Sequence, residues 1–227
     1  MAGAPRFALY YAPALDDPLW RRAATWLGRD PDSDAAVAQP GLADIAAITA
    51  DPRRYGFHAT LKPPFRLADG YGWTDVMAAA EAIARGIAAF DLPPLGVQAV
   101  HGFLALRESL ESPALQALSD ACVAGADHLR APPDAAELRR RGAGSLAPAQ
   151  EEMLRRWGYP YVFSTWFFHM TLTRRLDSGE DAIYRPAATA FFADCLDLPR
   201  RVRDICVFSE SAPGAPFRLA ARVPLRG

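Results

Sequence analysis

Hydrophobic and polar residues are distributed along the chain in a pattern that predicts short strands separated by amphipathic helices. Residues 7–11 form a short β-prone run. The acidic residues and early proline at 16–18 are typical of a helix start, and we expect that helix to reach about Gly28. The stretch 29–52 mixes Asp, Pro and short apolar clusters, which indicates a loop with one helical turn near Ile45.

Later segments are marked by clearer spacing. Residues 55–62 are aromatic and β-branched and are stopped by two prolines, which predicts a strand. Apolar residues from Val76 to Phe90 recur at helical intervals behind a capping Thr-Asp pair, which predicts a helix over 74–90. Further along we expect strands over 97–100 and 103–106, helices over 115–129 and 148–157, a strand over 165–173, a helix over 182–194, and strands over 202–208 and 217–223.

The two halves of the chain repeat one order of features: a strand with His-x-Thr-Leu, a helix, the tripeptide Asp-Leu-Pro, and another strand. His58 precedes its Asp91 by 33 residues, and His169 precedes its Asp197 by 28 residues. This similarity of order and spacing predicts a diverged internal duplication. We therefore expect a single bilobal α+β domain over 1–227, with two antiparallel sheets flanking a central cleft and helices outside.

Three segments are distinguished within that domain. The first motif lies in a lobe segment at about 53–110, and the second lies in a lobe segment at about 161–227. The region 131–160 has no counterpart in the repeat, so we interpret it as an insertion that could act as a lid.

Composition narrows the class of protein. With 51% hydrophobic and 22% charged residues, the chain can bury a substantial core. Its 25 basic and 26 acidic residues give a net charge of −1, which argues against a global basic field for long nucleic acids. The three cysteines form no CxxC pair and favour a reducing, cytoplasmic compartment. The apolar stretch near the N-terminus is too short for a membrane span.

The two motif strands are predicted to be polar on one side. Successive side chains of a strand point to opposite faces, so alternate residues share a face. One face then carries His58, Thr60 and Lys62 in the first strand and His169, Thr171 and Thr173 in the second.

A pseudo-twofold axis would bring these polar faces together in one cleft, and such a cleft suits a phosphodiester. One neutral histidine can accept a proton while a protonated histidine donates one to the leaving oxygen. The threonine hydroxyls can donate hydrogen bonds to the non-bridging oxygens. The pseudo-symmetry leaves open which histidine is the base.

Further candidates for substrate binding surround the motifs. Lys62 would add a point charge, and Arg175 falls on the cleft side if the second strand continues that far. Tyr10, Tyr55 and Tyr161 are more typical of core or rim aromatics than of base ligands; of the three, Tyr55 is kept as a candidate substrate contact.

The other histidines and the arginine run have simpler interpretations. The motif histidines lie in no HxH, HxxxH or HExxH pattern, and no acidic residue is spaced to complete a triad, so we expect no metal and no cofactor. His101 beside a turn glycine and His128 near a helix end are interpreted as structural. The run 139–141 of three arginines is typical of a solvated helix face, but it would supply phosphate-binding charge if the insertion folds over the cleft.

The two His-x-Thr tripeptides at 58–60 and 169–171 resemble those of the 2H phosphoesterase superfamily, which is named for such motifs in a duplicated, bilobal α/β fold. The longer stretches 54–65, 157–162 and 168–173 resemble the DUF1045 branch in particular, whose members are described as phosphonate metabolism proteins. The resemblance spans nearly the whole chain, including the insertion.

This resemblance implies His58 and His169 as acid and base and Thr60 and Thr171 as phosphate ligands. It implies a metal-independent phosphoesterase acting on a small cyclic phosphodiester, such as a cyclic ribose phosphate from phosphonate metabolism. Two alternatives stay open: an RNA 2′,3′-cyclic phosphodiesterase or 2′,5′ RNA ligase-like enzyme, which the near-neutral charge disfavours, and a non-catalytic phosphometabolite-binding module. We expect a small phosphorylated substrate and no membrane partner; the sequence does not define the oligomeric state.

Overall fold

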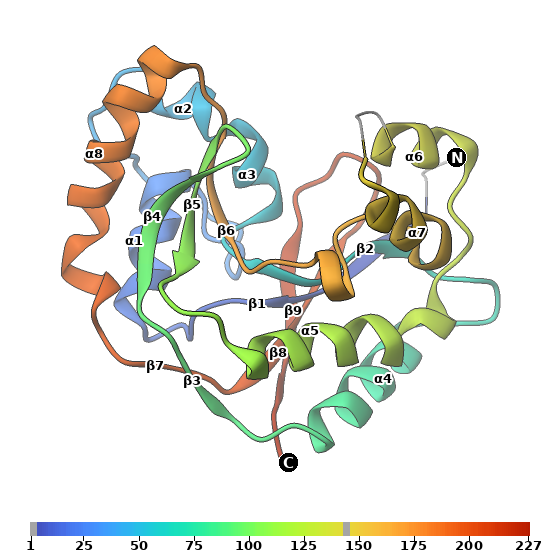
Figure 1. Cartoon of the computed structure of the whole chain (residues 1–227). Helices are drawn as coiled ribbons and strands as arrows, with labels where there is room; N and C mark the ends of the chain where they lie inside the picture. Colours follow the sequence, from blue (N-terminus) through green and yellow to red (C-terminus); the bar gives the residue numbers. More distant parts are fainter. Residues whose placement is uncertain (1–3, 143–145) are drawn as a thin grey trace.

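A large antiparallel sheet organises the computed structural model, which describes residues 4–142 and 146–227 (Figure 1). A second, small sheet pairs β3 (Phe90–Leu92) with β7 (Arg200–Val202). In spatial order, the seven strands of the large sheet are β4 (Leu95–Val100), β5 (Phe103–Glu108), β6 (Met170–Arg175), β2 (Ala59–Arg66), β1 (Arg6–Tyr11), β8 (Asp204–Glu210) and β9 (Arg218–Pro224).

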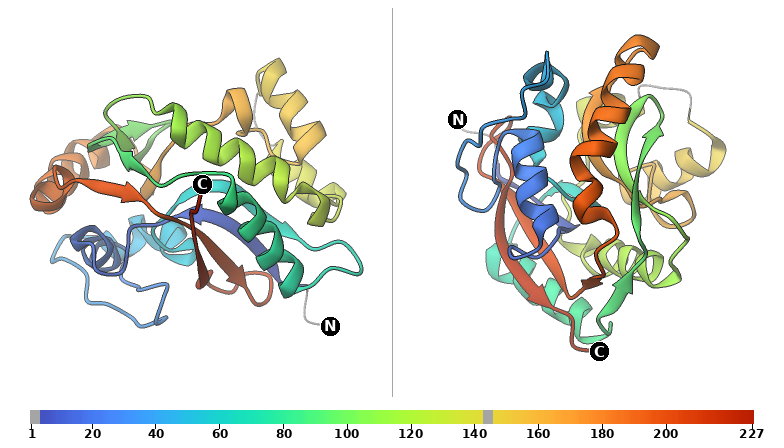
Figure 2. Two further views of the ribbon diagram at one scale, coloured as in Figure 1. Left: turned by 90° about the horizontal axis from the view of Figure 1, so that it is seen from below. Right: turned by 90° about the vertical axis from the view of Figure 1, so that its left-hand side faces the viewer.

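Helices cover the outside of this sheet system. The helix α1 packs beside α8, as the right-hand view of Figure 2 shows, and α4 packs beside α5. Two short 3-10 segments, Asp127–Leu129 and Phe163–Thr165, complete the regular structure of the described residues. The helices are α1 (Pro18–Leu27), α2 (Ile45–Ile48), α3 (Ala50–Tyr55), α4 (Trp73–Arg85), α5 (Pro113–Gly125), α6 (Ala135–Arg141), α7 (Pro148–Trp157) and α8 (Ser178–Leu196).

The two motif strands meet at the middle of the large sheet. Hydrogen bonding between β2 and β6 runs through the antiparallel pair Ala59 and Met170. The indole of Trp166 adds a bond across the same junction by donating to the Thr60 carbonyl at 2.8 Å. Each His-x-Thr motif therefore sits where one half of the sheet joins the other.

The two halves of the sheet exchange strands along the sequence. The strands β4 and β5, which follow the first motif, lie beside β6 of the second motif. Conversely, β8 from the C-terminal part pairs with β1, and β9 pairs with β8, so both extend the half of the sheet that contains β1 and β2. The short strands β3 and β7, one from each half of the chain, also pair with each other. This arrangement makes the two halves of the chain interdependent, because neither half of the sheet is built from one continuous stretch.

A buried core fixes the helices on the sheet. The helix α1 starts behind Asp17, whose side chain accepts a hydrogen bond from the Leu19 amide, and ends at Gly28 with φ 81°. Trp26 of this helix is fully buried, packs against Phe192 of α8 and donates its indole N–H to the Leu172 carbonyl of β6 at 3.0 Å. The outer helical layer is thereby tied to the second motif strand.

The predicted α+β fold with antiparallel sheets and outer helices is confirmed. The helix near 16–28, the turn of helix near Ile45 and the helix over 148–157 are all present. Boundaries differ at the motifs, because the strand expected over 165–173 begins only at Met170 and a 3-10 turn precedes it. The helix α3 was not predicted, since an internal proline and a following strand-like segment obscure it.

The remaining boundary differences are local. The helix expected over 74–90 ends at Arg85, and Phe90 begins β3 instead. Within the part of the chain that the structure describes, no helix has both the length and the apolar character needed to cross a bilayer.

Candidate active site

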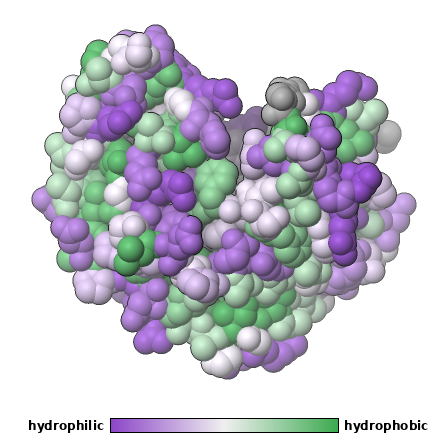
Figure 3. Space-filling view, viewed as in Figure 1, coloured by the Kyte–Doolittle hydropathy of each residue, from purple (hydrophilic) through white to green (hydrophobic). Residues whose placement is uncertain are grey.

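A cleft at the junction of the two sheet halves contains both motif histidines. It consists of two adjoining cavities of about 270 Å³ each, which share His58, His169, Thr171 and Tyr55 in their linings. Figure 3 shows a notch in the surface between the part that carries α8 and the part that carries α6. The two imidazoles therefore lie in one shared space that is open to solvent.

His58 is oriented by the backbone immediately before it. Its Nδ1 lies 2.8 Å from the Gly56 carbonyl, which can only accept, so Nδ1 carries the proton. Its Nε2 lies 3.2 Å from the Thr60 hydroxyl. Gly56 has φ 76°, and a Cβ there would lie 2.7 Å from the side chain of Pro31, so a glycine is required at this turn. The lone pair of neutral His58 is thus on Nε2, next to the cleft threonine.

His169 is held in the matching way. Its Nδ1 lies 3.1 Å from the Phe167 carbonyl, again two residues earlier in the chain. The ring stacks on Phe167 with centroids 4.7 Å apart, as the ring of His58 stacks on Tyr10 at 3.7 Å. Both motifs therefore fix the same tautomer, in which Nε2 carries the lone pair of the neutral ring.

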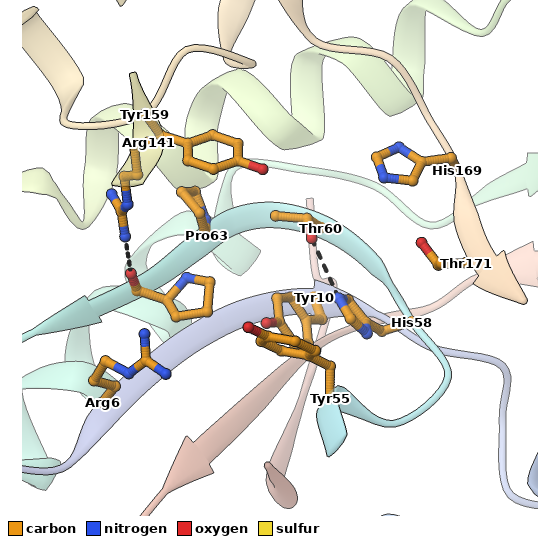
Figure 4. A pocket seen from close by; sticks show the side chains of 11 residues that line it. Arg6, Tyr10, Tyr55, His58, Thr60, Pro63, Arg141, Tyr159, His169 and Thr171 are labelled. Carbon is orange, nitrogen blue, oxygen red and sulfur yellow. Dashed lines mark hydrogen bonds between the residues drawn. The ribbon is translucent and has the colours of Figure 1, made fainter. Parts of the chain in front are cut away.

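The register at the sheet junction gathers the four motif residues. The antiparallel pair Ala59 and Met170 points its side chains to one face, so the neighbours on either side share the other face. Continuing this register by one residue sets His58 opposite Thr171 and Thr60 opposite His169. Figure 4 shows these four side chains, of His58, Thr60, His169 and Thr171, around one part of the cavity.

The electrostatic environment keeps both imidazoles neutral. Burial lowers the pKa of His58 to about 4, against the opposing effect of its bond to the Gly56 carbonyl, and the nearby His169 lowers this pKa further. Burial also lowers the pKa of His169, with a further contribution from Arg107. At neutral pH each ring can serve as a base, and an acid role requires a negative charge beside it.

This arrangement predicts the titration of His58. We expect the ligand-free protein to keep His58 neutral at pH 6 and to protonate it only near pH 4. Inorganic phosphate should raise that pKa, because a bound anion stabilises the imidazolium. The pH dependence of the His58 Cε1–H chemical shift measures both values. In the His169→Ala variant the depression should be smaller, whereas a midpoint near 6.5 in the ligand-free wild type would contradict the burial of this ring.

The other predicted binding residues differ in their exposure and in the cavities that they line. Tyr55 lines both cavities, and its hydroxyl accepts a bond of 2.6 Å from Arg54. Thr173 is buried in the wall of the second cavity, where its hydroxyl accepts from the Leu104 amide at 3.0 Å. Arg175 is exposed at the edge of the same cavity.

Lys62 departs from the expectation. Its ammonium is buried, lies 3.1 Å from the Asp127 carboxylate, donates to the Val123 carbonyl at 3.0 Å and lines neither cavity. The pairing of β2 with β1 shifts between Thr60, opposite Tyr10, and Lys62, opposite Leu9. This bulge inserts an extra residue and turns Lys62 to the face opposite the cleft. Lys62 is therefore placed as a structural cation.

The structure adds cleft residues that were not predicted, among them Arg6 and Tyr159, and it also places Tyr10 and Arg141 in the lining. Arg6 and Tyr10 reach the cleft from alternate positions of β1, and Tyr159 reaches it after α7. Of the arginine run, Arg141 lines the cleft while Arg139 is exposed. The period-two spacing of Arg6 and Tyr10 is a signal that the sequence offers, but their proximity to His58 depends on strand pairing far apart in the chain.

The remaining histidines lie outside the cleft lining. His128 is exposed and contacts Tyr71 edge-on, and His101 occupies a turn with φ 46°. Within the ranges 4–142 and 146–227, no group of three or more His, Cys, Asp or Glu side chains is placed to hold a metal ion. What the cleft provides is imidazole, hydroxyl and guanidinium groups.

Comparison with known proteins adds a family and several relatives. A family model described as "Protein of unknown function (DUF1045)" matches residues 60–218. Two curated relatives are both described as ribose 1,5-bisphosphate phosphokinase PhnN. The protein from Janthinobacterium sp. (strain Marseille) is 38% identical over 98% of this chain and 51% of its own length, and that from Laribacter hongkongensis (strain HLHK9) is 37% identical over 96% and 51%. The chain thus spans about half the length of these relatives.

Solved structures show a more distant likeness. E. coli LigT complexed with NADP+ has 13% identity and a TM-score of 0.47, covering 100% of both chains. LigT complexed with 3'-AMP has 13% identity and a TM-score of 0.46, covering 98% of this chain and 99% of its own. TT0787 of Thermus thermophilus has 17% identity and a TM-score of 0.46 over 98% of each chain.

Proposed function

The chain belongs to the DUF1045 family, and on that premise we propose that it is a metal-independent 2H-type phosphoesterase that opens a small cyclic phosphodiester. One observation carries the proposal. Two histidines from different repeats have Nδ1 fixed on a backbone carbonyl and line one cleft together with Thr171, with Thr60 beside His58. Paired Nε2 groups of defined tautomer are what acid–base catalysis at phosphorus requires.

The proposed reaction is a hydrolysis in which one histidine accepts a proton and the other donates one. Nε2 of one histidine accepts a proton from water as the water oxygen bonds to phosphorus. The bond from phosphorus to one ring oxygen breaks, and Nε2 of the other histidine donates a proton to that oxygen. The Thr60 and Thr171 hydroxyls donate to the non-bridging oxygens, where negative charge increases. Either histidine can take either role.

Because both histidines are neutral in the free protein, the general acid must gain its proton when the substrate binds. A cyclic phosphodiester carries one negative charge, and this charge raises the pKa of whichever imidazole it contacts. The substrate thus helps to protonate its own general acid, while the other ring stays neutral as the base. Burial of both rings strengthens this coupling, because charges interact more strongly away from bulk water.

The names of the relatives support one substrate class. Two relatives that cover nearly the whole of this chain are named for a kinase of ribose 1,5-bisphosphate, and we propose a cyclic phosphate of ribose in phosphonate metabolism as the substrate. The size of the cleft, about 270 Å³ on each side of the histidines, suits a small sugar phosphate.

Phosphorus NMR of a panel of cyclic phosphates tests this proposal. The panel comprises ribose 1,2-cyclic phosphate with and without a 5-phosphate, and nucleoside 2′,3′-cyclic and 3′,5′-cyclic phosphates. We expect a cyclic ribose phosphate to be converted to a monoester at the same rate with and without EDTA, since the proposed chemistry needs only imidazoles and hydroxyls. Substrates that stay intact over hours at high protein concentration would indicate a binding module. Loss of activity on chelation with rescue by zinc or manganese would indicate a metalloenzyme. A preference for the nucleoside 2′,3′-cyclic ester would indicate that the substrate is an RNA end.

A further inference from the structure

The first cavity of the cleft is chemically divided along its length. His58, His169 and Thr171 lie at one end, and the guanidinium groups of Arg6 and Arg141 lie at the opposite end (Figure 4). We call the part lined by these two arginines the arginine end. A reaction at one phosphorus atom between the histidines does not use these two cations.

Arg6 is anchored by a fully buried acid. The Glu210 carboxylate accepts from Nε at 2.5 Å and from Nη2 at 2.8 Å, and it also accepts from the Gly214 amide at 3.0 Å. Among the residues that the structure describes, none is bonded to Nη1 of Arg6. The carboxylate thus fixes the guanidinium plane and leaves one edge available to a ligand in the cavity.

Arg141 is fixed from the other side of the same end. It pairs with Glu137 at 2.6 Å and donates to the Pro64 carbonyl at 2.8 Å and to the Gly158 carbonyl. Its guanidinium also lies over the ring of Tyr159, with the carbon 5.4 Å from the ring centroid. These contacts hold the Arg141 side chain in place, and it still lines the cavity.

Tyrosine side chains occupy the space between the two ends. Tyr10, Tyr55 and Tyr159 all line the cavity, and Figure 4 shows their rings between the arginines and His169. Burial raises the pKa of Tyr10 and of Tyr159, so their hydroxyl groups stay protonated at neutral pH and can donate hydrogen bonds. Hydroxyl donors above flat aromatic rings suit the hydroxyl groups and carbon skeleton of a sugar.

We propose that the arginine end binds a second, terminal phosphate monoester of the sugar whose cyclic phosphodiester lies between the histidines. Arg6 lies four residues from Tyr10 along β1, a separation of about 13 Å, and its long side chain covers part of that distance. One pentose with phosphates at both ends spans the remainder. The inference rests on the proposed function and narrows its substrate to a doubly phosphorylated sugar.

The chemistry of this subsite also defines a place in a reaction sequence. Opening the cyclic ester of such a substrate leaves the terminal phosphate in place and yields a sugar bisphosphate. A ribose bisphosphate is the compound in the name of the two curated relatives, which are about twice as long as this chain. The enzyme that consumes the product must therefore act on a sugar that carries two phosphate monoesters.

Two matched substrates test the subsite. We expect ribose 1,2-cyclic phosphate 5-phosphate to be hydrolysed with a kcat/KM on the order of 10–100-fold above that of the same cyclic ester without the 5-phosphate, which is the range for hydrogen bonds to charged groups. Arg141→Gln should remove most of this preference, because it should lower kcat/KM far more for the 5-phosphorylated ester than for the other. Arg139→Gln, an exposed arginine of the same helix, should leave both values unchanged.

A binding measurement separates this inference from the proposed hydrolysis. Ribose 5-phosphate has no cyclic ester, and we expect it to bind to the wild type and to His169→Ala alike, and at least about 10-fold more weakly to Arg141→Gln. Arg6→Lys keeps a cation beside Glu210 but has a single nitrogen in place of the three of the guanidinium, so it removes the free edge and repeats the test if Arg141→Gln does not fold.

The outcomes are distinguishable. Equal hydrolysis of the two esters would overturn the subsite and leave the phosphoesterase proposal intact. Arginine-dependent binding of ribose 5-phosphate without turnover of either ester would support the subsite and overturn the hydrolysis. Absence of both binding and turnover would overturn both.

Discussion

Replacement of His58 or of His169 by alanine is expected to lower kcat at least about 100-fold, which is the lower end of what a positioned acid or base contributes. Each ring has one nitrogen committed to a backbone carbonyl and the other directed to the shared cleft. Alanine removes Nε2, and we expect it to leave the strand after each histidine, β2 or β6, intact. The measurement is the single-turnover rate on the cyclic ester found by phosphorus NMR, together with thermal unfolding of each variant.

His128→Ala is the matched control for this experiment, because His128 is exposed and lies outside the cleft lining. It should keep wild-type turnover, and all three variants should unfold in one cooperative transition. Near-normal turnover in either motif variant would remove that histidine from the mechanism. Unequal pH profiles of the two variants would assign the base and the acid, a choice that the paired geometry leaves open.

Local alternation explains how much of the site was predictable from sequence. A polar residue at every second position of a short strand shares a face whatever the rest of the fold does. The two tripeptides thus define His58 with Thr60 and His169 with Thr171, and Tyr55 lies close enough in sequence to accompany them. The duplicated order of features supplied the expectation that the two faces meet.

The remaining cleft residues depend on interactions that no short stretch encodes. Tyr10 stacks on His58 because β1 pairs with β2 across about 50 residues of chain. Arg141 lies opposite Arg6 because α6 returns to the edge of β2, where it donates to the Pro64 carbonyl. Neither contact has a periodic signature, so the sequence offered the run 139–141 as phosphate-binding charge only on the condition that the insertion folds over the cleft, and it did not indicate that Arg141 would lie opposite Arg6.

The exchange of strands between the sheet halves connects the fold to the site. Since β8 and β9 support β1, and β4 and β5 support β6, the sheet around the two motif strands is built from both halves of the chain. The histidines then meet at the junction of Ala59 with Met170, where the backbone of each half restrains the other. A small shift of one half would change the separation of the two Nε2 atoms, so the proposed reaction depends on the rigidity of this junction.

Substitutions of Lys62 are expected to change the stability of the fold without changing the activity. Lys62→Ala is expected to lower the free energy of unfolding by about 3 kcal/mol, roughly a 150-fold change in the folding equilibrium. The Val123 carbonyl and the Asp127 carboxylate lose the ammonium that donates to them. Asp127 keeps Arg130 as a partner, so the loss lies at the low end for a broken buried pair. Denaturant unfolding followed by fluorescence measures the change.

Lys62→Met is the informative companion, because methionine fills the space of the aliphatic stem and removes only the charge. We expect it to cost about 1 kcal/mol or less and to leave kcat and KM unchanged, since the bulge after Thr60 turns this side chain to the face opposite the cleft. A phosphate ligand would behave in the opposite way: the methionine variant would keep its stability and lose kcat/KM by about 100-fold. That result would return Lys62 to the active site and would require the strand to turn its face differently when substrate binds.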